Sequence, residues 1–345
     1  MNVGDSFFSP DLFYVHLAIV TFVGFFFGSF LNVCIYRIPA GLSIVAPGSH
    51  CFSCGTPIRW YDNIPLLSYI CLRGRCRYCG STFSVRYFIV ELLTGILFGI
   101  TFFHFRYTLA TPVYIVFVCL LIVATFTDLD HWIIPDGVTV CGTLFALFAA
   151  ILAGFYPKGF IIAGTLPFYQ VAIYSPLANA LTGAVAGALL IYAIGVAGSI
   201  AFRREAMGFG DVKLFLLVGA MLGVVNCVYV LTIASCIGSL VGGGMILARG
   251  ISERRARRRG AGSDADNKIS EFGKGDERDD LTQAQPTEED EIFQKIISAY
   301  KTVGTKTKSA LPGVHHIPFG PYIAIAAIIV LYLGERIHHY LFGMW

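Results

Sequence analysis

The chain has 345 residues, of which 56% are hydrophobic and only 14% are charged. Soluble domains carry charge on roughly a quarter of their residues, so this composition, with a mean hydropathy of +0.69, excludes an ordinary soluble enzyme. It predicts an all-α polytopic membrane protein, in which the formal net charge of +3 matters mainly through the placement of the basic residues.

Apolar segments recur along the whole chain. A helix needs about 20 apolar residues to cross a bilayer, and we expect about eight such helices. They lie at about 13–36, 87–104, 112–127, 137–155, 177–201, 212–226, 228–248 and 317–340. The residues before the first segment include no Lys or Arg, unlike the basic start of a cleavable signal peptide, so we expect the first helix to be retained.

The basic residues lie on one side of this predicted topology. If the N-terminus is outside, the connections 37–86, 202–213 and 249–316 are cytoplasmic, and they hold all but three of the 25 Lys and Arg residues. Basic residues accumulate in cytoplasmic loops, which favours this orientation. Eight spans then place the C-terminus outside as well.

The first apolar segment ends in residues 28–33 (GSFLNV), which lead into residues 36–39 (YRIP). Small residues allow helices to approach closely in lipid, and Asn32 can hydrogen-bond to a neighbouring helix. Packing alone would also account for this run.

Four of the ten cysteines form two C-x-x-C pairs, Cys51 with Cys54 and Cys76 with Cys79, and a glycine follows each pair. Paired motifs at this separation are typical of a tetrahedral zinc site, and the predicted site is structural because four thiolates leave no open position. Two disulfides are the alternative, which a cytoplasmic location disfavours. Residues 60–65, between the pairs, can either contact a substrate or close the zinc module.

Three carboxylates interrupt the apolar pattern within residues 127–136 (TDLDHWIIPD). Charge at membrane depth is costly and often functional. Asp128 follows the carboxyl end of a predicted helix, where the helix dipole disfavours a carboxylate, so local structure does not explain it. Asp130 and Asp136 are equally consistent with helix capping, the latter as a first-turn acid after Pro135.

A second acidic motif, Gly208-Phe209-Gly210-Asp211, opens a later apolar segment. Asp211 could simply cap that helix, while Gly208 and Gly210 would let the backbone approach a bound peptide closely. Two carboxylates brought face to face share one proton and can hold a water that attacks an amide. Asp128 and Asp211 are therefore the candidate catalytic pair, with Asp130, Pro135, Asp136, Gly208 and Gly210 as supporting residues.

The segment 252–312 differs in composition from its surroundings. It is rich in Arg, Gly, Asp and Gln up to about residue 287 and has few apolar side chains, so we predict a largely disordered cytoplasmic insertion. Its Arg cluster at 254–259 favours anionic lipid headgroups over nucleic acid, and residues 288–300 are predicted to form an amphipathic helix on the bilayer surface. His315 and His316, before residues 318–321 (PFGP), are weak candidates for metal ligands.

The ordered set of motifs resembles the type IV prepilin peptidases, a family of G-x-G-D aspartic proteases. The resemblance rests on residues 28–39, the two C-x-x-C pairs, residues 87–95, 128–136, 208–211 and 318–321. It implies five parts: an N-terminal transmembrane segment (1–36), a cytoplasmic zinc-binding loop associated with the methyltransferase activity (37–86), a transmembrane peptidase core (87–251), the insertion (252–312) and a last helix (313–345).

The resemblance also implies an activity and a location. The expected enzyme lies in the bacterial inner membrane, cleaves prepilins and pseudopilins after a glycine on the cytoplasmic face, and N-methylates the new N-terminal residue. By resemblance Asp128 and Asp211 are catalytic, zinc is structural, and S-adenosylmethionine is the methyl donor, for which no binding residues can be named from the sequence.

Two other classes of function compete with the enzyme. A transporter could use membrane aspartates as a proton relay, but it should show repeated spans, which this sequence lacks. A scaffold of a secretion apparatus could use the zinc module as a docking surface. Replacing Asp128 or Asp211 alone distinguishes them, because only an aspartic protease should lose cleavage while keeping its fold.

Overall fold

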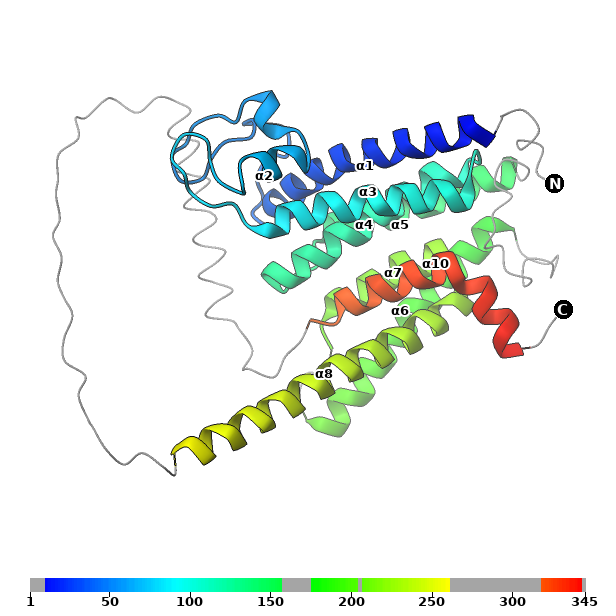
Figure 1. Cartoon of the computed structure of the whole chain (residues 1–345). Helices are drawn as coiled ribbons and strands as arrows, with labels where there is room; N and C mark the ends of the chain where they lie inside the picture. Colours follow the sequence, from blue (N-terminus) through cyan, green and yellow to red (C-terminus); the bar gives the residue numbers. More distant parts are fainter. Residues whose placement is uncertain (1–9, 157–174, 204–206, 261–317, 343–345) are drawn as a thin grey trace.

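The computed structural model describes residues 10–156, 175–203, 207–260 and 318–342 (Figure 1). The predicted amphipathic helix at 288–300 and the pair of histidines at 315 and 316 lie outside these residues. So do the predicted disorder of 261–287 and most of the proposed insertion.

The described residues form helices, with no strand among them. Their bounds are α1 (Pro10–Arg37), η1 (Trp60–Asn63), α2 (Leu67–Cys71), α3 (Val85–Phe105), α4 (Ala110–His131), α5 (Asp136–Phe155), α6 (Pro176–Phe202), α7 (Phe209–Leu222), α8 (Val224–Gly260) and α10 (Gly320–Phe342). Seven of these helices are long and apolar enough to cross a membrane. The chain is therefore a multi-pass helical membrane protein, as its composition predicts.

The eighth predicted span is the exception. The segment predicted at 212–226 corresponds to α7, which has 14 residues and at about 1.5 Å per residue is roughly 21 Å long. A hydrocarbon core is about 30 Å thick, so α7 alone is too short to cross it. It ends at Gly223, whose φ of +81° suits glycine, and α8 begins at the next residue.

The long helices lie side by side, and a small module of loops, η1 and α2 sits at one end of the bundle (Figure 1). α1 runs toward this module and α3 leads away from it. The end of α4 and the starts of α5, α7 and α10 all lie at the module's end. The two acidic motifs therefore reach the same end of the bundle, as the topology drawn from the sequence requires.

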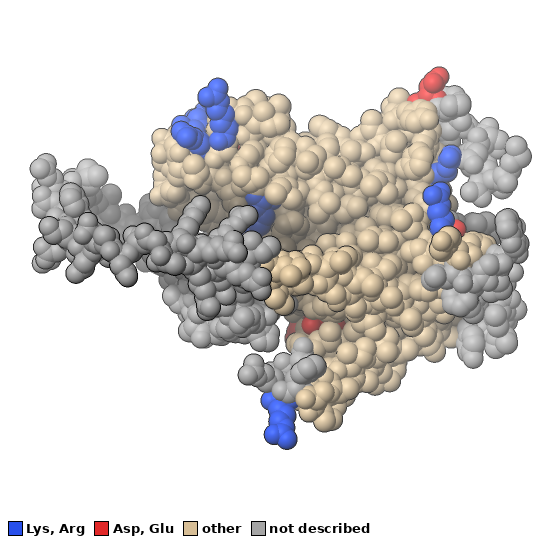
Figure 2. Space-filling view, turned by 60° about the horizontal axis from the view of Figure 1, so that its bottom comes forward, with Lys and Arg blue, Asp and Glu red and all other residues tan. Residues whose placement is uncertain are grey.

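Charged side chains on the face shown in Figure 2 lie mainly toward the two ends of the molecule and leave a broad uncharged surface between them. The described residues also include many exposed large apolar side chains, such as Phe22 at 57% and Phe148 at 56% exposure. Exposed apolar residues in a continuous band are what a helix bundle presents to lipid.

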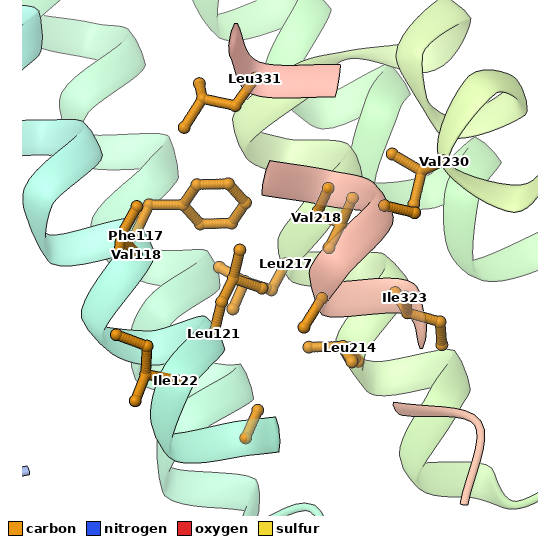
Figure 3. Packing of buried hydrophobic residues seen from close by; sticks show 14 of the residues in the cluster. Phe117, Val118, Leu121, Ile122, Leu214, Leu217, Val218, Val230, Ile323 and Leu331 are labelled. Atoms are coloured by element: carbon orange, nitrogen blue, oxygen red, sulfur yellow. The ribbon is translucent and has the colours of Figure 1, made fainter. Parts of the chain in front are cut away.

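The core lies between α4, α7, α8 and α10 (Figure 3). Phe117 and Leu121 of α4 face Leu217 of α7. Leu214 of α7 and Ile323 of α10 belong to the same buried cluster. All five side chains are fully buried. This packing joins the helix that carries Asp128 to the helix that carries Asp211.

Glycines allow the closest helix crossings. A Cβ on Gly28 of α1 would lie 2.6 Å from the Cα of Glu91 on α3, and a Cβ on Gly183 or Gly219 would overlap the carbonyl oxygen of the other. Asn32 Nδ2 also donates a hydrogen bond of 3.1 Å to the carbonyl of Tyr87 on α3. The expected close approach and interhelical hydrogen bond of residues 28–33 are thus confirmed.

α8 extends well past its predicted end at residue 248. It has 37 residues, about 55 Å at 1.5 Å per residue, and projects beyond the rest of the bundle (Figure 1). The segment at 252–260 was predicted to be disordered and is helical instead. Arg is a good helix former, and helix α8 continues through this Arg-rich stretch to Gly260.

Candidate active site and metal centre

Asp128 lies in the last turn of α4. The helix ends at His131 because Trp132 adopts a left-handed conformation (φ +58°) and donates its N–H to the carbonyl of Asp128. This bond satisfies one of the free carbonyls at the helix end. The side chain of Asp128 is only 7% exposed, so its carboxyl group points into the protein and not into water.

Asp211 lies in the first turn of α7. The sequence left open that Asp211 itself caps this helix, but Gly208 occupies the N-cap position with extended backbone (φ −73°, ψ 146°). Asp211 is 8% exposed, where the positive end of the helix dipole favours a carboxylate. The extended backbone at Gly208 sets the direction in which α7 starts.

A third segment reaches Asp128. The backbone N–H of Gly320, the first residue of α10, donates a hydrogen bond of 3.1 Å to Asp128 Oδ2. A Cβ on Gly320 would overlap that same oxygen. The sequence did not predict this contact, which explains why a buried carboxylate is tolerated at the carboxyl end of α4.

Ile134 joins the three segments. It lies between α4 and α5 and is 7% exposed. A Cβ built on Gly210 would be 3.4 Å from Ile134, and one built on Gly320 would be 3.2 Å from Ile134 Cδ1. The negative charges of Asp128 and Asp211 also interact electrostatically. The structure therefore brings together the two aspartates, Gly210 and Gly320 around one side chain.

The two other predicted acidic residues make ion pairs with neighbouring helices. Asp130 pairs with Arg86 in the first turn of α3, and Asp136 in the first turn of α5 pairs with Lys213 of α7 at 2.5 Å. The sequence predicted neither cation as a partner, although each stands in a basic connection near a helix start. Asp130 and Asp136 thus hold helix ends in place, and Pro135 is the N-cap of α5.

The four cysteines of the C-x-x-C pairs converge in the module between α1 and α3. Their sulfur atoms all lie within 4.8 Å of one another, and the Cys51 and Cys79 sulfurs are 3.7 Å apart. Four thiolates at 2.3 Å from one tetrahedral zinc ion would be about 3.8 Å apart. This group could hold a metal ion, and 3.7 Å is far longer than a disulfide bond of about 2.05 Å.

The two halves of the metal centre repeat the same local structure. Gly55 N–H bonds to the carbonyl of Cys51, and Gly80 N–H bonds to that of Cys76. Both glycines have positive φ, +71° and +72°, a conformation that favours glycine. Isolated β-bridges flank each turn, His50 with Pro57 and Arg75 with Thr82. Each C-x-x-C pair is thus a tight knuckle, as the sequence predicts.

Hydrogen bonds favour the thiolate form of two of these cysteines. Burial raises the pKa of Cys51, but hydrogen bonds from Ser81 and from the backbone of Cys54 and Ser53 outweigh it and bring the pKa to about 6. The Ser81 side chain and backbone likewise lower the pKa of Cys79. Thiolates are the form that binds metal, so the site fits a soft divalent cation.

The loop between the knuckles closes the module. Arg77, in the second knuckle, makes a two-pronged ion pair with Asp62 of η1, with Nε to Oδ2 at 2.9 Å and Nη2 to Oδ1 at 2.6 Å. The hydrogen bond from Arg77 lowers the pKa of Asp62. Of the two roles that the sequence left open for residues 60–65, this ion pair supports closure of the module.

We expect one zinc ion per chain at this centre, measurable by metal analysis of the purified protein. Replacing Cys51, Cys54, Cys76 and Cys79 together by Ser should abolish zinc binding and lower the amount of folded protein, because metal-binding energy contributes to the folding of such modules. Replacing Cys141, which is exposed on α5, is the matched control. Unchanged zinc content in the fourfold variant would contradict the assignment.

Fold and site together define a multi-pass helical membrane protein with two buried aspartates at one end of its bundle and a four-cysteine centre at the same end. Two family models match the chain: the bacterial peptidase A24 N-terminal domain over residues 22–105 and the type IV leader peptidase family over residues 115–243. The chain belongs to the type IV leader peptidase family, as its motifs predict.

Curated relatives agree with this family. A prepilin leader peptidase/N-methyltransferase of Myxococcus xanthus is 41% identical over 242 residues, covering 70% of this chain and 67% of the relative. Proteins of the same name from Aeromonas salmonicida and Klebsiella pneumoniae are 31% and 36% identical, over 68% and 58% of this chain and 83% and 82% of theirs. No solved structure matches the chain significantly.

Proposed function

We propose that this chain is a membrane aspartic endopeptidase that cleaves the leader peptide of prepilins and pseudopilins after a glycine, and that it methylates the new N-terminus. The convergence of Asp128, Asp211 and the Gly320 amide at one end of the bundle carries the peptidase part of the proposal. Family membership and the names of the relatives support both activities.

The two aspartates share one proton in this mechanism. The ionised carboxyl group takes a proton from a water molecule held between them, while the protonated one donates to the scissile carbonyl oxygen. The water oxygen bonds to the carbonyl carbon, and the C–N bond then breaks as the leaving amine takes up a proton from the pair. Burial of both side chains lowers the local dielectric and strengthens their effect on this reaction.

The active site is proposed to face the cytoplasm in a bacterial inner membrane. The support is the distribution of basic residues, which accumulate in cytoplasmic connections. The metal centre and both acidic motifs lie on the same side as these basic connections. Both termini are proposed to lie outside, because the start of α1 and the end of α10 lie at the end of the bundle opposite the four-cysteine module (Figure 1), although α7 alone is too short to cross. In this proposal the scissile bond of the prepilin lies beside the end of α4 and the start of α7, where Asp128 and Asp211 stand. Zinc is proposed as the structural metal of the four cysteines.

Methylation requires a donor in addition to these groups. When bound, S-adenosylmethionine would supply an electrophilic methyl group to the new N-terminal amine, whose proton would pass to water.

Co-expression with a prepilin tests the peptidase. We expect the prepilin to shift to the size of its mature form on a gel, and mass spectrometry should place the new N-terminus directly after a glycine. An unprocessed prepilin in membranes that contain the folded protein would contradict the proposed function.

A further inference from the structure

A cavity of about 160 Å³ lies between α1, the zinc module and the start of α3. A single water molecule needs roughly 10–15 Å³ of such space, so the cavity has room for a ligand of several rings. Every residue that lines it falls between 29 and 91. The cavity is therefore separate from the two catalytic aspartates, and the peptidase mechanism leaves it without a role.

One buried acceptor in this cavity has no partner. Asn32 lines the cavity and is 4% exposed. Its Nδ2 donates to the carbonyl of Tyr87, which fixes the orientation of the amide, and its Oδ1 makes no hydrogen bond. Buried acceptors are normally satisfied, so an unsatisfied one at a cavity wall indicates a ligand that donates a hydrogen bond.

A carboxylate stands beside this acceptor. Glu91, four residues after Tyr87 on α3, lines the same cavity. Its Oε2 accepts a hydrogen bond of 2.8 Å from the backbone N–H of Leu66, and Ser29 of α1 also bonds to it. These contacts hold the carboxyl group at the junction of α1, α3 and the module, where it can bind hydroxyl groups or a cation.

The outer wall of the cavity is aromatic. Tyr36 of α1 and Phe52 of the first knuckle are 4.9 Å apart between ring centroids, and His50 packs against Phe52 at 5.6 Å. Arg75 also lines the cavity, beside the second knuckle. Flat apolar surfaces of this kind hold nucleobases by stacking, and an arginine binds a ligand carboxylate.

We propose that this cavity binds the adenosyl methyl donor, a proposal that rests on the proposed N-methyltransferase function. The base stacks on the wall formed by Tyr36 and Phe52, and its amino group donates to Asn32 Oδ1. Glu91 accepts from the ribose hydroxyl groups or faces the sulfonium. Arg75 binds the carboxylate of the methionine moiety.

The position of the cavity is suited to receive the new N-terminus of a prepilin that has been cleaved at the peptidase site. Arg86, next to Tyr87, forms an ion pair with Asp130, two residues after Asp128. The start of α3 is thus bound to the end of α4, and the donor cavity keeps a set position relative to the catalytic pair. A newly exposed N-terminus can then move from one to the other within the same membrane-side surface.

Binding of S-adenosylmethionine to the purified full-length protein in detergent tests the proposal by titration calorimetry. We expect Glu91→Gln and Asn32→Leu each to weaken binding at least about tenfold, since each loses a buried hydrogen bond to the ligand. Val45→Ala is the matched control, because Val45 lies in the same module, is 85% exposed and does not line the cavity. Zinc content and thermal unfolding establish that each variant is folded.

Several outcomes would overturn the inference. Wild-type binding strength in folded Glu91→Gln and Asn32→Leu would place the donor elsewhere. If neither variant folds, photocrosslinking of radiolabelled S-adenosylmethionine to the unaltered protein decides: label on peptides within residues 29–91 supports the site, and label only outside them refutes it. A wild-type protein that cleaves prepilin without binding the donor refutes this inference alone, whereas absence of cleavage refutes the peptidase.

Discussion

Asp128→Asn and Asp211→Asn are each expected to reduce prepilin cleavage by a factor on the order of 10⁴, as losses of single members of a catalytic unit do. Asparagine keeps the size of the side chain and its place in the core but cannot accept the proton of the attacking water. Single-turnover cleavage of a purified prepilin in detergent measures the effect, and membrane abundance should stay at the wild-type level.

The matched control is Glu335→Gln, the same change of carboxylate to amide on α10, toward the opposite end of that helix from Gly320. It should alter the cleavage rate by no more than about twofold, as substitutions away from a site usually do. Substantial cleavage by either aspartate variant, or an equal loss in the control, would refute the catalytic pair. Loss of activity in Asp130→Asn with an active Asp128→Asn would assign the role to Asp130.

Gly320→Ala is expected to slow cleavage by roughly 100-fold, the usual cost of displacing a catalytic group by about 1 Å. The added Cβ would overlap Asp128 Oδ2, so either the carboxyl group rotates away or α10 shifts, and the hydrogen bond from the Gly320 N–H is lost in both cases. Because the change displaces the Asp128 carboxyl group, which acts in the transition state, kcat should fall while KM changes little.

Gly334→Ala on the same helix is the control for this prediction. A Cβ there would lie 3.4 Å from Val330 Cγ1, an ordinary contact, and alanine in a helix interior is more stable than glycine by up to about 1 kcal/mol. Its cleavage rate should match the wild type. Full activity in Gly320→Ala would show that the Gly320 amide does not position Asp128.

Local patterns in the sequence were sufficient to predict the individual helices and knuckles. A C-x-x-C pair followed by glycine is typical of a tight turn, and Gly55 and Gly80 both adopt positive φ there. The boundary between α7 and α8 was predicted less well. The sequence analysis placed it between the segments 212–226 and 228–248, whereas the structure places it at Gly223, because apolar residues continue across both positions.

The sequence by itself determined the membrane class, the four-cysteine group and the two acidic motifs. The length of an apolar segment, the spacing of paired cysteines and a charge within an apolar segment each depend only on residues that are neighbours in the sequence. Only the tertiary structure decided which partners those motifs have. The Gly320 amide reaches Asp128 across 192 positions, Arg86 pairs with Asp130, and Asn32 is left with an unpaired oxygen beside a cavity. Contacts of this kind depend on how helices cross, and the crossings are set by the packing of α4, α7 and α10 around a shared core, which no local pattern specifies.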